Sequence, residues 1–134
     1  MKTINHECYV SPEIAKLLEQ VGFDWKCKYA YIVTPEGDMS TGEEGMLTDY
    51  VENVNWIVKA PTLDVAQRWL REVKGLIVQI DFLRHNKWWY LVLQGERVET
   101  LENPRVKFNT YEQAQEAGIK KVLEIILEKS RIRI

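Results

Sequence analysis

Histidine and cysteine, the side chains best suited to bind transition metals or act as nucleophiles, occur at four positions of this 134-residue chain. They are His6, Cys8, Cys27 and His85. His6 and Cys8 form the one close pair, and the third and fourth ligands that a zinc site needs do not follow nearby. The two cysteines lack a CxxC spacing, which favours unpaired thiols in a reducing compartment. The sequence therefore predicts no metal site and no cofactor.

The remaining polar residues do not form a recognisable catalytic motif. Serine occurs only at Ser11, Ser40 and Ser130, and none of these lies in a nucleophile elbow. The glycine-rich segment 35–48 lacks the Lys-Ser/Thr pair of a phosphate-binding loop. Its carboxylates also lack the residue order of a calcium loop. We therefore expect no catalytic residue, and a protein that is not an enzyme.

One predicted hairpin combines cations with aromatic rings at Arg84, Lys87, Trp88 and Tyr90. Bases stack on such rings while cations meet phosphates, so the hairpin is a candidate nucleic-acid site. Alternatively, the rings pack beneath a helix or the segment that follows the hairpin, as most large aromatics do. A third interpretation is a protein interface, because the strand from Trp88 to Gln94 is apolar on both faces. We expect its Trp88/Tyr90 face to meet a partner, first of all a second copy of the chain.

Composition and charge describe an ordinary globular protein. Hydrophobic residues make up 46% of the chain and charged residues 28%, which is close to the average for folded domains. The formal net charge is −2, so the basic excess typical of nucleic-acid binders is missing and a protein partner is favoured. No run approaches the roughly 20 apolar residues of a membrane span. The first ten residues hold no apolar run of signal-peptide length, so we expect a cytoplasmic protein without membrane contact.

Three segments have the signals of amphipathic helices. They cover residues 11–22, residues 62–75 and the chain from residue 110 onward. Ser11, Thr62 and Thr110 are favoured N-cap residues, and Gln113 completes a capping box with Thr110. Gly75 is suited to end the second helix in the left-handed conformation. Apolar residues recur at helical spacing within each segment.

Alternating apolar residues predict four strands, at residues 26–33, 51–59, 76–82 and 88–94. The acidic segment at about 35–48 is expected to be a flexible loop without regular structure. Residues 95–109 are expected to be irregular, with a short strand at 105–108 as one interpretation. The predicted order is αββαββα. We therefore expect a single α+β domain over residues 1–134, with a mainly antiparallel four-stranded sheet packed with helices.

Four short motifs stand out in the chain. They are APT at 60–62, WLREVKG at 69–75, WY at 89–90, and TYEQA at 110–114 followed by AG at 117–118. In these motifs the chain resembles a family of short Bacteroidetes proteins without an assigned function, over roughly Ser11 to Ile126. Members of that family typically lie among prophage and mobile-element genes. The resemblance implies an accessory protein of a phage or mobile element, and it implies no catalytic or binding residue.

Together these observations predict a non-enzymatic binding protein whose partner is another protein or a second copy of itself. The alternative is a nucleic-acid-binding accessory protein that uses the basic-aromatic hairpin at 84–90. The candidate partner contacts are the same for both functions: Trp88, Tyr90, Arg84 and Lys87.

Overall fold

A computed structural model describes residues 8–33, 39–43, 56–95, 99–102 and 106–132. Their elements, in chain order, are α1 (Pro12–Gln20), β1 (Tyr29–Val33), β2 (Met39–Glu43), β3 (Trp56–Lys59), α3 (Leu63–Lys74), β4 (Leu76–Leu83), a 3-10 turn (Arg84–Asn86), β5 (Lys87–Gln94), β6 (Glu99–Glu102) and α4 (Tyr111–Ile132). Helices and antiparallel strands thus occur together, and the α+β class is confirmed.

Local side-chain caps explain where the helices begin. The Ser11 hydroxyl accepts a hydrogen bond from the Ile14 amide at 3.3 Å, and the Thr62 hydroxyl accepts one from the Val65 amide at 3.2 Å. Each bond satisfies an amide that has no partner within its own helix. Gly75 ends α3 with a φ of 71°, a conformation that glycine adopts without the steric penalty of a side chain.

The start of α4 follows the same chemistry with a reciprocal bond. The Thr110 hydroxyl accepts from the Gln113 amide at 3.0 Å, and the Gln113 side-chain oxygen accepts from the Asn109 amide at 3.1 Å. One amide of the first helical turn and one amide that precedes the helix are satisfied in this way. The predicted capping pair is therefore present, with the glutamine reaching one residue further back than expected.

The strands form two antiparallel three-stranded sheets, with strand orders β2-β1-β3 and β4-β5-β6. The prediction of one four-stranded sheet is wrong. The two expected strand pairs, β1 with β3 and β4 with β5, belong to separate sheets, and each pair has a third strand, β2 or β6. β2 lies within the acidic segment and pairs with β1, so that segment is not wholly without structure. Its remaining residues, 35–38 and 44–48, lie outside the described part of the chain. The observed order is αβββαβββα.

The segment after β5 is also more regular than its sequence indicates. Residues 99–102 form β6 and pair with β5, with a register shift between Val92 and Leu93. The strand expected at 105–108 is reduced to a bridge, in which Phe108 and Trp88 exchange two backbone hydrogen bonds of 2.7 and 2.9 Å. β5 is therefore the central strand of its sheet: β4 pairs with its whole length on one side, and Phe108 and β6 pair with its two ends on the other.

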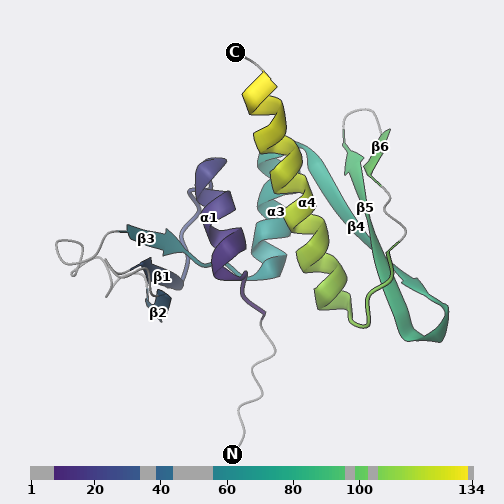
Figure 1. Cartoon of the computed structure of the whole chain (residues 1–134), viewed down its shortest axis with the longest axis horizontal. Coiled ribbons are helices and arrows are strands. Elements are labelled where there is room, and N and C mark those ends of the chain that lie inside the picture. Colours follow the sequence, from purple (N-terminus) through teal and green to yellow (C-terminus); the bar gives the residue numbers. More distant parts are fainter. Residues whose placement is uncertain (1–7, 34–38, 44–55, 96–98, 103–105, 133–134) are drawn as a thin grey trace, which may run out of the picture.

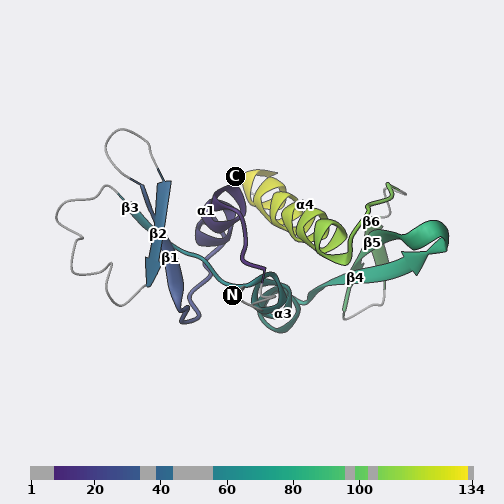
Figure 2. The same ribbon diagram turned by 90° about the horizontal axis from the view of Figure 1, so that it is seen from below.

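The α-helices of the described residues, α1, α3 and α4, lie between the two sheets (Figures 1 and 2). α3 and α4 both pack on the same side of the β4-β5-β6 sheet, and α1 packs against α4. A continuous apolar core joins α1, α3, α4 and strands from both sheets, with Trp69, Leu70, Ile119 and Leu123 almost fully buried within it. No helix in the described part of the chain is long and apolar enough to cross a membrane.

A series of hydrogen-bonded polar side chains links α3, α4 and β4 within this core. Gln115 of α4 is 2% exposed, and its side-chain nitrogen donates to Asp64 at 2.7 Å and to Gln67 at 2.8 Å. Gln67 in turn donates to the carbonyl oxygen of Val78 at 2.6 Å. These bonds satisfy a buried amide and also an outward-pointing carbonyl of the edge strand β4. The positions of both helices on the sheet are thereby linked.

Candidate binding surface

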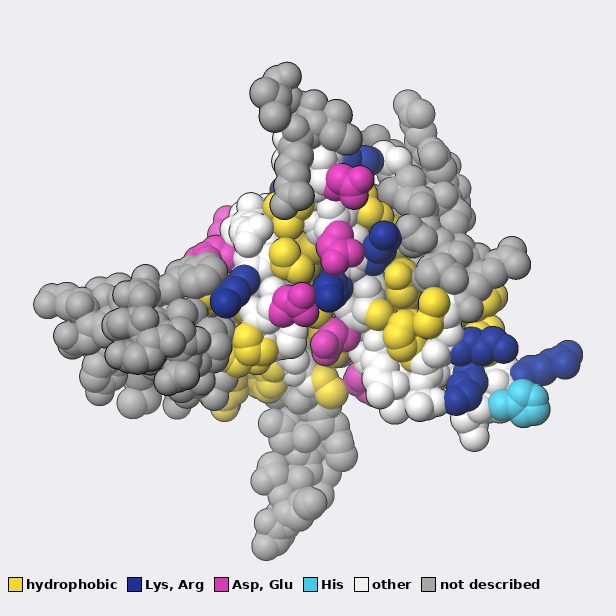
Figure 3. All heavy atoms as spheres, viewed as in Figure 1, with side chains coloured by type: hydrophobic (Ala, Val, Ile, Leu, Met, Phe, Trp, Pro, Cys, Tyr) yellow, Lys and Arg dark blue, Asp and Glu magenta, His cyan; other side chains and the backbone are white. Residues whose placement is uncertain are grey.

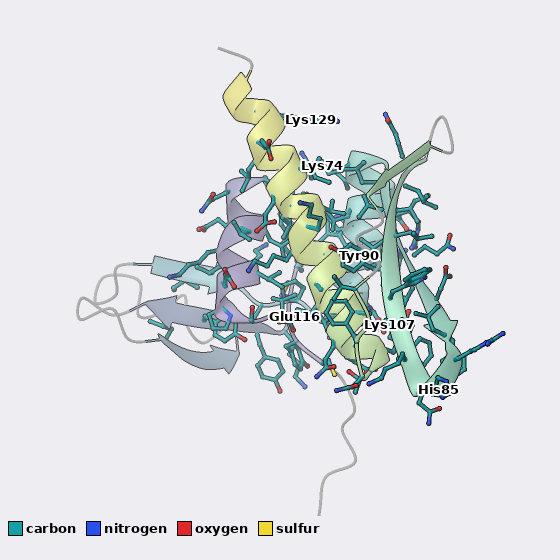
Figure 4. The ribbon with its side chains drawn as sticks, turned by 45° about the vertical axis from the view of Figure 1, so that its right-hand side comes forward. Lys74, His85, Tyr90, Lys107, Glu116 and Lys129 are labelled. Carbon is teal, nitrogen blue, oxygen red and sulfur yellow. The ribbon has the colours of Figure 1, made fainter. Side chains whose placement is uncertain are left out.

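The structure places the aromatic residues of the predicted hairpin site on the covered side of the sheet. Tyr90 is only 7% exposed and packs near Phe108, with ring centroids 6.2 Å apart. Trp88 is half-buried and contacts the ring of Tyr111 in α4 edge-on, at 5.4 Å. Tyr90 therefore belongs to the core and has little surface to offer a partner (Figure 4). The expected uncovered Trp88/Tyr90 face is corrected, since α4 and Phe108 cover these rings.

Strand register explains the correction. β4 and β5 pair so that Ile80 lies opposite Tyr90 and Asp81 lies opposite Trp89. Because side chains alternate between faces, the even-numbered residues of both strands point toward the helices and the odd-numbered residues point away. We call the second set the outer face. Its residues are Ile77, Gln79, Asp81, Leu83, Lys87, Trp89, Leu91 and Leu93.

The outer face is apolar, and no described element covers it. Five of its eight residues are Ile, Leu or Trp, and none of these five belongs to the core or packs against it. The described helices that contact β4 and β5 are α3 and α4, and both lie on the other side of the sheet (Figures 1 and 2). The five apolar side chains are half-buried. An uncovered apolar surface of this kind marks an interaction site.

The polar residues of the outer face lie toward its β4 edge and the hairpin end. Gln79 donates to Asp81 at 3.1 Å, and the Lys87 ammonium donates to the side-chain oxygen of Asn109. Asp81 and Lys87 are the two charged residues of the face as defined above, and their charges cancel. Trp89, Leu91 and Leu93 form a continuous apolar row along the central strand beside them. An apolar centre with polar residues at its margin is the usual composition of a protein interface.

The turn between β4 and β5 presents cations to solvent. Arg84, His85 and Asn86 are all exposed, and His85 and Asn86 have φ values of 63° and 58°. The basic side chains project from the end of the hairpin together with His85 (Figures 3 and 4). Phe82 is 58% exposed beside them, with its ring edge-on to Trp88 at 4.9 Å. The predicted residues Arg84 and Lys87 are thus together at one end of the sheet.

A cleft of about 800 Å³ opens where the N-terminal segment meets α1 and α4. Its lining includes Cys8, Glu13, Glu112, Glu116 and Lys120. Burial raises the pKa of the Cys8 thiol above its ordinary value, and the carboxylates of Glu112, Asp64 and Glu116 raise it further. A thiol with a raised pKa stays protonated at neutral pH and is a poor nucleophile.

The described residues contain no group of three or more His, Cys, Asp or Glu side chains placed to hold a metal ion. His6, the other half of the closely spaced pair considered from sequence, lies outside the described residues. His85 lies at the tip of the β4–β5 hairpin (Figure 4), whereas Cys8 lines the cleft beside α1 and α4.

The sequence contained a signal for the outer face that depends on pairing. Gln79 and Asp81 interrupt one face of β4, and solvent-facing residues are more often polar than core residues. The register sets these two residues opposite Leu91 and Trp89 of β5. The Trp89/Leu91 face is therefore the outer one, although β5 alone is apolar on both sides.

Comparisons with protein-family models, with curated proteins and with solved structures find no match to this chain.

Proposed function

We propose that this chain is a non-enzymatic binding protein, and that it docks another protein on the outer face of the β4-β5-β6 sheet. The observation that supports the proposal is the row Trp89, Leu91 and Leu93, which lies outside the core on a face that the described helices leave open. Each of these side chains gains by losing contact with water when a partner covers it, by about 25 cal/mol for each Å² of apolar surface. An accessory role beside other proteins of a phage or mobile element agrees with this proposal.

Protein rather than nucleic acid is the favoured partner because of the chemistry of this face. Nucleic-acid surfaces are dominated by phosphate charge, and the proteins that bind them supply cations. The outer face instead presents apolar side chains with one Asp and one Lys, a combination that matches another protein surface.

The test compares two surface variants in a capture experiment from native cell extract. Leu91→Glu places a charge in the middle of the outer face, whereas Val73→Glu places the same charge on α3, where Val73 is 52% exposed. We expect the parent and Val73→Glu to capture the same protein and Leu91→Glu to lose it. Equal capture by all three, with unchanged circular dichroism spectra, would contradict docking at this face.

A second function, binding of single-stranded nucleic acid at the hairpin tip, is favoured by the local charge. Residues 82–95 contain no Asp or Glu. Lys107 precedes Phe108, which bridges to Trp88, and adds a second cation to this end of the sheet (Figure 4). Arg84 and Lys107 form no ion pair within the described residues. Phe82 offers an exposed ring on which a base can stack.

The experiment for this second function measures fluorescence anisotropy of a labelled single-stranded oligonucleotide at low and at physiological salt. Binding that weakens steeply with salt, and that Arg84→Ala and Lys107→Ala reduce while Arg71→Ala on α3 leaves it unchanged, would support the tip as a nucleic-acid site. Absence of binding at low salt would rule out the hairpin tip as a nucleic-acid site.

A further inference from the structure

We propose that a small pocket at the carboxyl ends of α3 and α4 binds a phosphate monoester. The site is separate from the outer face, because it lies on the helix-covered side of the sheet and at the end opposite the β4–β5 turn. The pocket has a volume of about 260 Å³, and six residues line it: Lys74, Leu76, Gln94, Ile126, Lys129 and Ser130.

The fold brings these residues together from three parts of the chain. Lys74 is the last residue of α3, and Gly75 turns the chain directly into β4. Gln94 of β5 pairs with Leu76, the first residue of β4. The Gly95 amide then donates to the carbonyl oxygen of Gly75 at 2.9 Å, which holds the end of β5 beside the end of α3. The last turns of α4 complete the pocket.

The polar groups of the pocket are donors suited to a phosphate. Each lysine ammonium group has three N–H donors, and the Ser130 hydroxyl and the Gln94 amide add neutral donors. Lysine binds phosphate groups as a point charge. Two lysine charges match the charge of about −1.5 to −2 that a phosphate monoester carries at pH 7. A carboxylate has one negative charge and would leave one ammonium group unmatched.

No Asp or Glu is among the described residues that line the pocket. Glu124 and Glu128, which belong to the same part of α4, line a different groove on the side of α1. Within the part of the chain that the structure describes, neither Lys74 nor Lys129 forms an ion pair. The positive charge of the two lysines is therefore available to an anion.

An aromatic ring positions one of the two lysines. The Lys74 ammonium lies 5.5 Å from the centroid of the Trp69 ring, within the range of a cation–π interaction. Trp69 is 1% exposed, so the ring itself is fixed in the core. The negative carboxyl ends of the helices also favour cations here when no ligand is bound. Figure 4 shows Lys74 and Lys129 at the same end of the molecule, away from His85.

The size and the floor of the pocket limit the ligand. Leu76 is 8% exposed and Ile126 is half-buried, and together they supply an apolar floor. The volume is just below the range of about 300–1,000 Å³ that sites for drug-sized ligands occupy. The pocket therefore fits a phosphate group on a short carbon chain, either a small metabolite or a phosphorylated side chain, and is too small for a whole nucleotide.

The experiment titrates the full chain with propyl phosphate and follows the backbone amides of Leu76 and Lys129 and the side-chain amide of Gln94 by NMR. We expect saturable shifts with a Kd of about 1–10 mM, because both lysines are exposed and water screens their charges. Butyrate, which has a similar carbon chain and a single negative charge, should bind about fivefold more weakly or less.

Three variants test the role of the lysines. Lys74→Gln and Lys129→Gln should each weaken binding of propyl phosphate about fivefold or more, because each removes a charged donor. Lys121→Gln removes the same charge from α4 on the side of the other groove, and it should change the affinity by less than about twofold. All three residues lie at or near the surface, so circular dichroism melts should stay close to that of the parent.

A phosphoserine peptide separates the two sources of the phosphate group. Tighter binding than that of propyl phosphate would assign the pocket to a phosphorylated protein, and weaker binding would assign it to a free metabolite. Three results would overturn the proposal: no saturable shift at the pocket residues, butyrate binding as tightly as propyl phosphate, or an equal loss in Lys121→Gln and Lys129→Gln. None of them bears on docking at the outer face, which Leu91→Glu tests separately.

Discussion

Gly118 of α4 packs directly against Val78 of β4. A Cβ atom at position 118 would lie 2.5 Å from Cγ1 of Val78, and also 3.1 Å from Cγ of Tyr90. Val78 is 3% exposed and β-branched, so it has little room to turn away. Glycine at this position is therefore required by the distance between helix and sheet, although it is a poor helix former.

From this contact we expect Gly118→Ala to destabilise the protein by about 1–3 kcal/mol, the usual effect of overpacking a core. The better helix propensity of alanine offsets at most about 1 kcal/mol of that loss. Urea unfolding measures the difference. Combining Gly118→Ala with Val78→Ala should cost less than the sum of the two single variants, because the second change removes the atom that the new methyl group meets. Strict additivity would show that the contact is looser than the structure has it.

Trp69 is the largest fully buried side chain of α3, at 1% exposure, and its ring meets Phe23 edge-on with centroids 5.3 Å apart. Trp69→Ala should lower the free energy of unfolding by about 3–5 kcal/mol. Its indole nitrogen is buried and makes no hydrogen bond to the described residues, so Trp69→Phe should retain most of the stability. Val73→Ala on the exposed side of the same helix serves as the control. Similar thermal melts for Trp69→Ala and Val73→Ala would contradict the orientation of α3.

Features set by neighbouring residues could be predicted from the sequence, and features set by pairing could not. The starts of the helices at Ser11, Thr62 and Thr110 depend on hydrogen bonds within three residues, and each of them is confirmed. β2 contains Gly42 and no alternating apolar pattern, so only its pairing with β1 shows it to be a strand. Propensity within a short segment carries no information on such a partner.

The position of the outer face also could not be predicted from the sequence of a single strand. β5 is apolar on both sides, so its own residues do not reveal which side the helices cover. The answer comes from α4, where Gly118 allows close approach to Tyr90, and from β4, where Gln79 pairs with Leu91. Arg84 and Lys87 were placed correctly at the hairpin end because a turn between two strands is a local feature.

Stability should fall at alkaline pH partly through Tyr31. Burial raises the pKa of its phenol above the ordinary value, and the carboxylate of Glu116 raises it further. In the unfolded chain this group loses its proton near pH 10, while the folded chain keeps it to higher pH. The contribution of Tyr31 to stability is therefore complete below about pH 10 and is lost as pH rises through the folded-state pKa.

Tyr31→Phe tests this pH dependence. The phenol donates a hydrogen bond of 2.7 Å to the carbonyl oxygen of Val10, so the variant should lose about 0.5–1.5 kcal/mol at neutral pH. Above pH 10 its stability should fall less steeply than that of the parent, and the two curves should converge. Urea unfolding at a series of pH values from 7 to 11 measures both effects. Parallel curves over the whole range would show that Tyr31 titrates alike in the folded and unfolded chain.

The assignment of the two faces of β5 is tested by charging two adjacent residues. Tyr90 is 7% exposed and lies beneath α4, whereas Leu91 is half-exposed on the outer face. Tyr90→Glu buries a carboxylate and removes a core ring, which together should unfold the protein or cost at least about 3 kcal/mol. Leu91→Glu should keep the fold and change stability by less than about 1 kcal/mol, because its charge remains in contact with water. Thermal melts followed by circular dichroism compare the two directly. If Leu91→Glu unfolds the chain and Tyr90→Glu does not, the helices cover the opposite face of the sheet, and the proposed docking surface is lost with it.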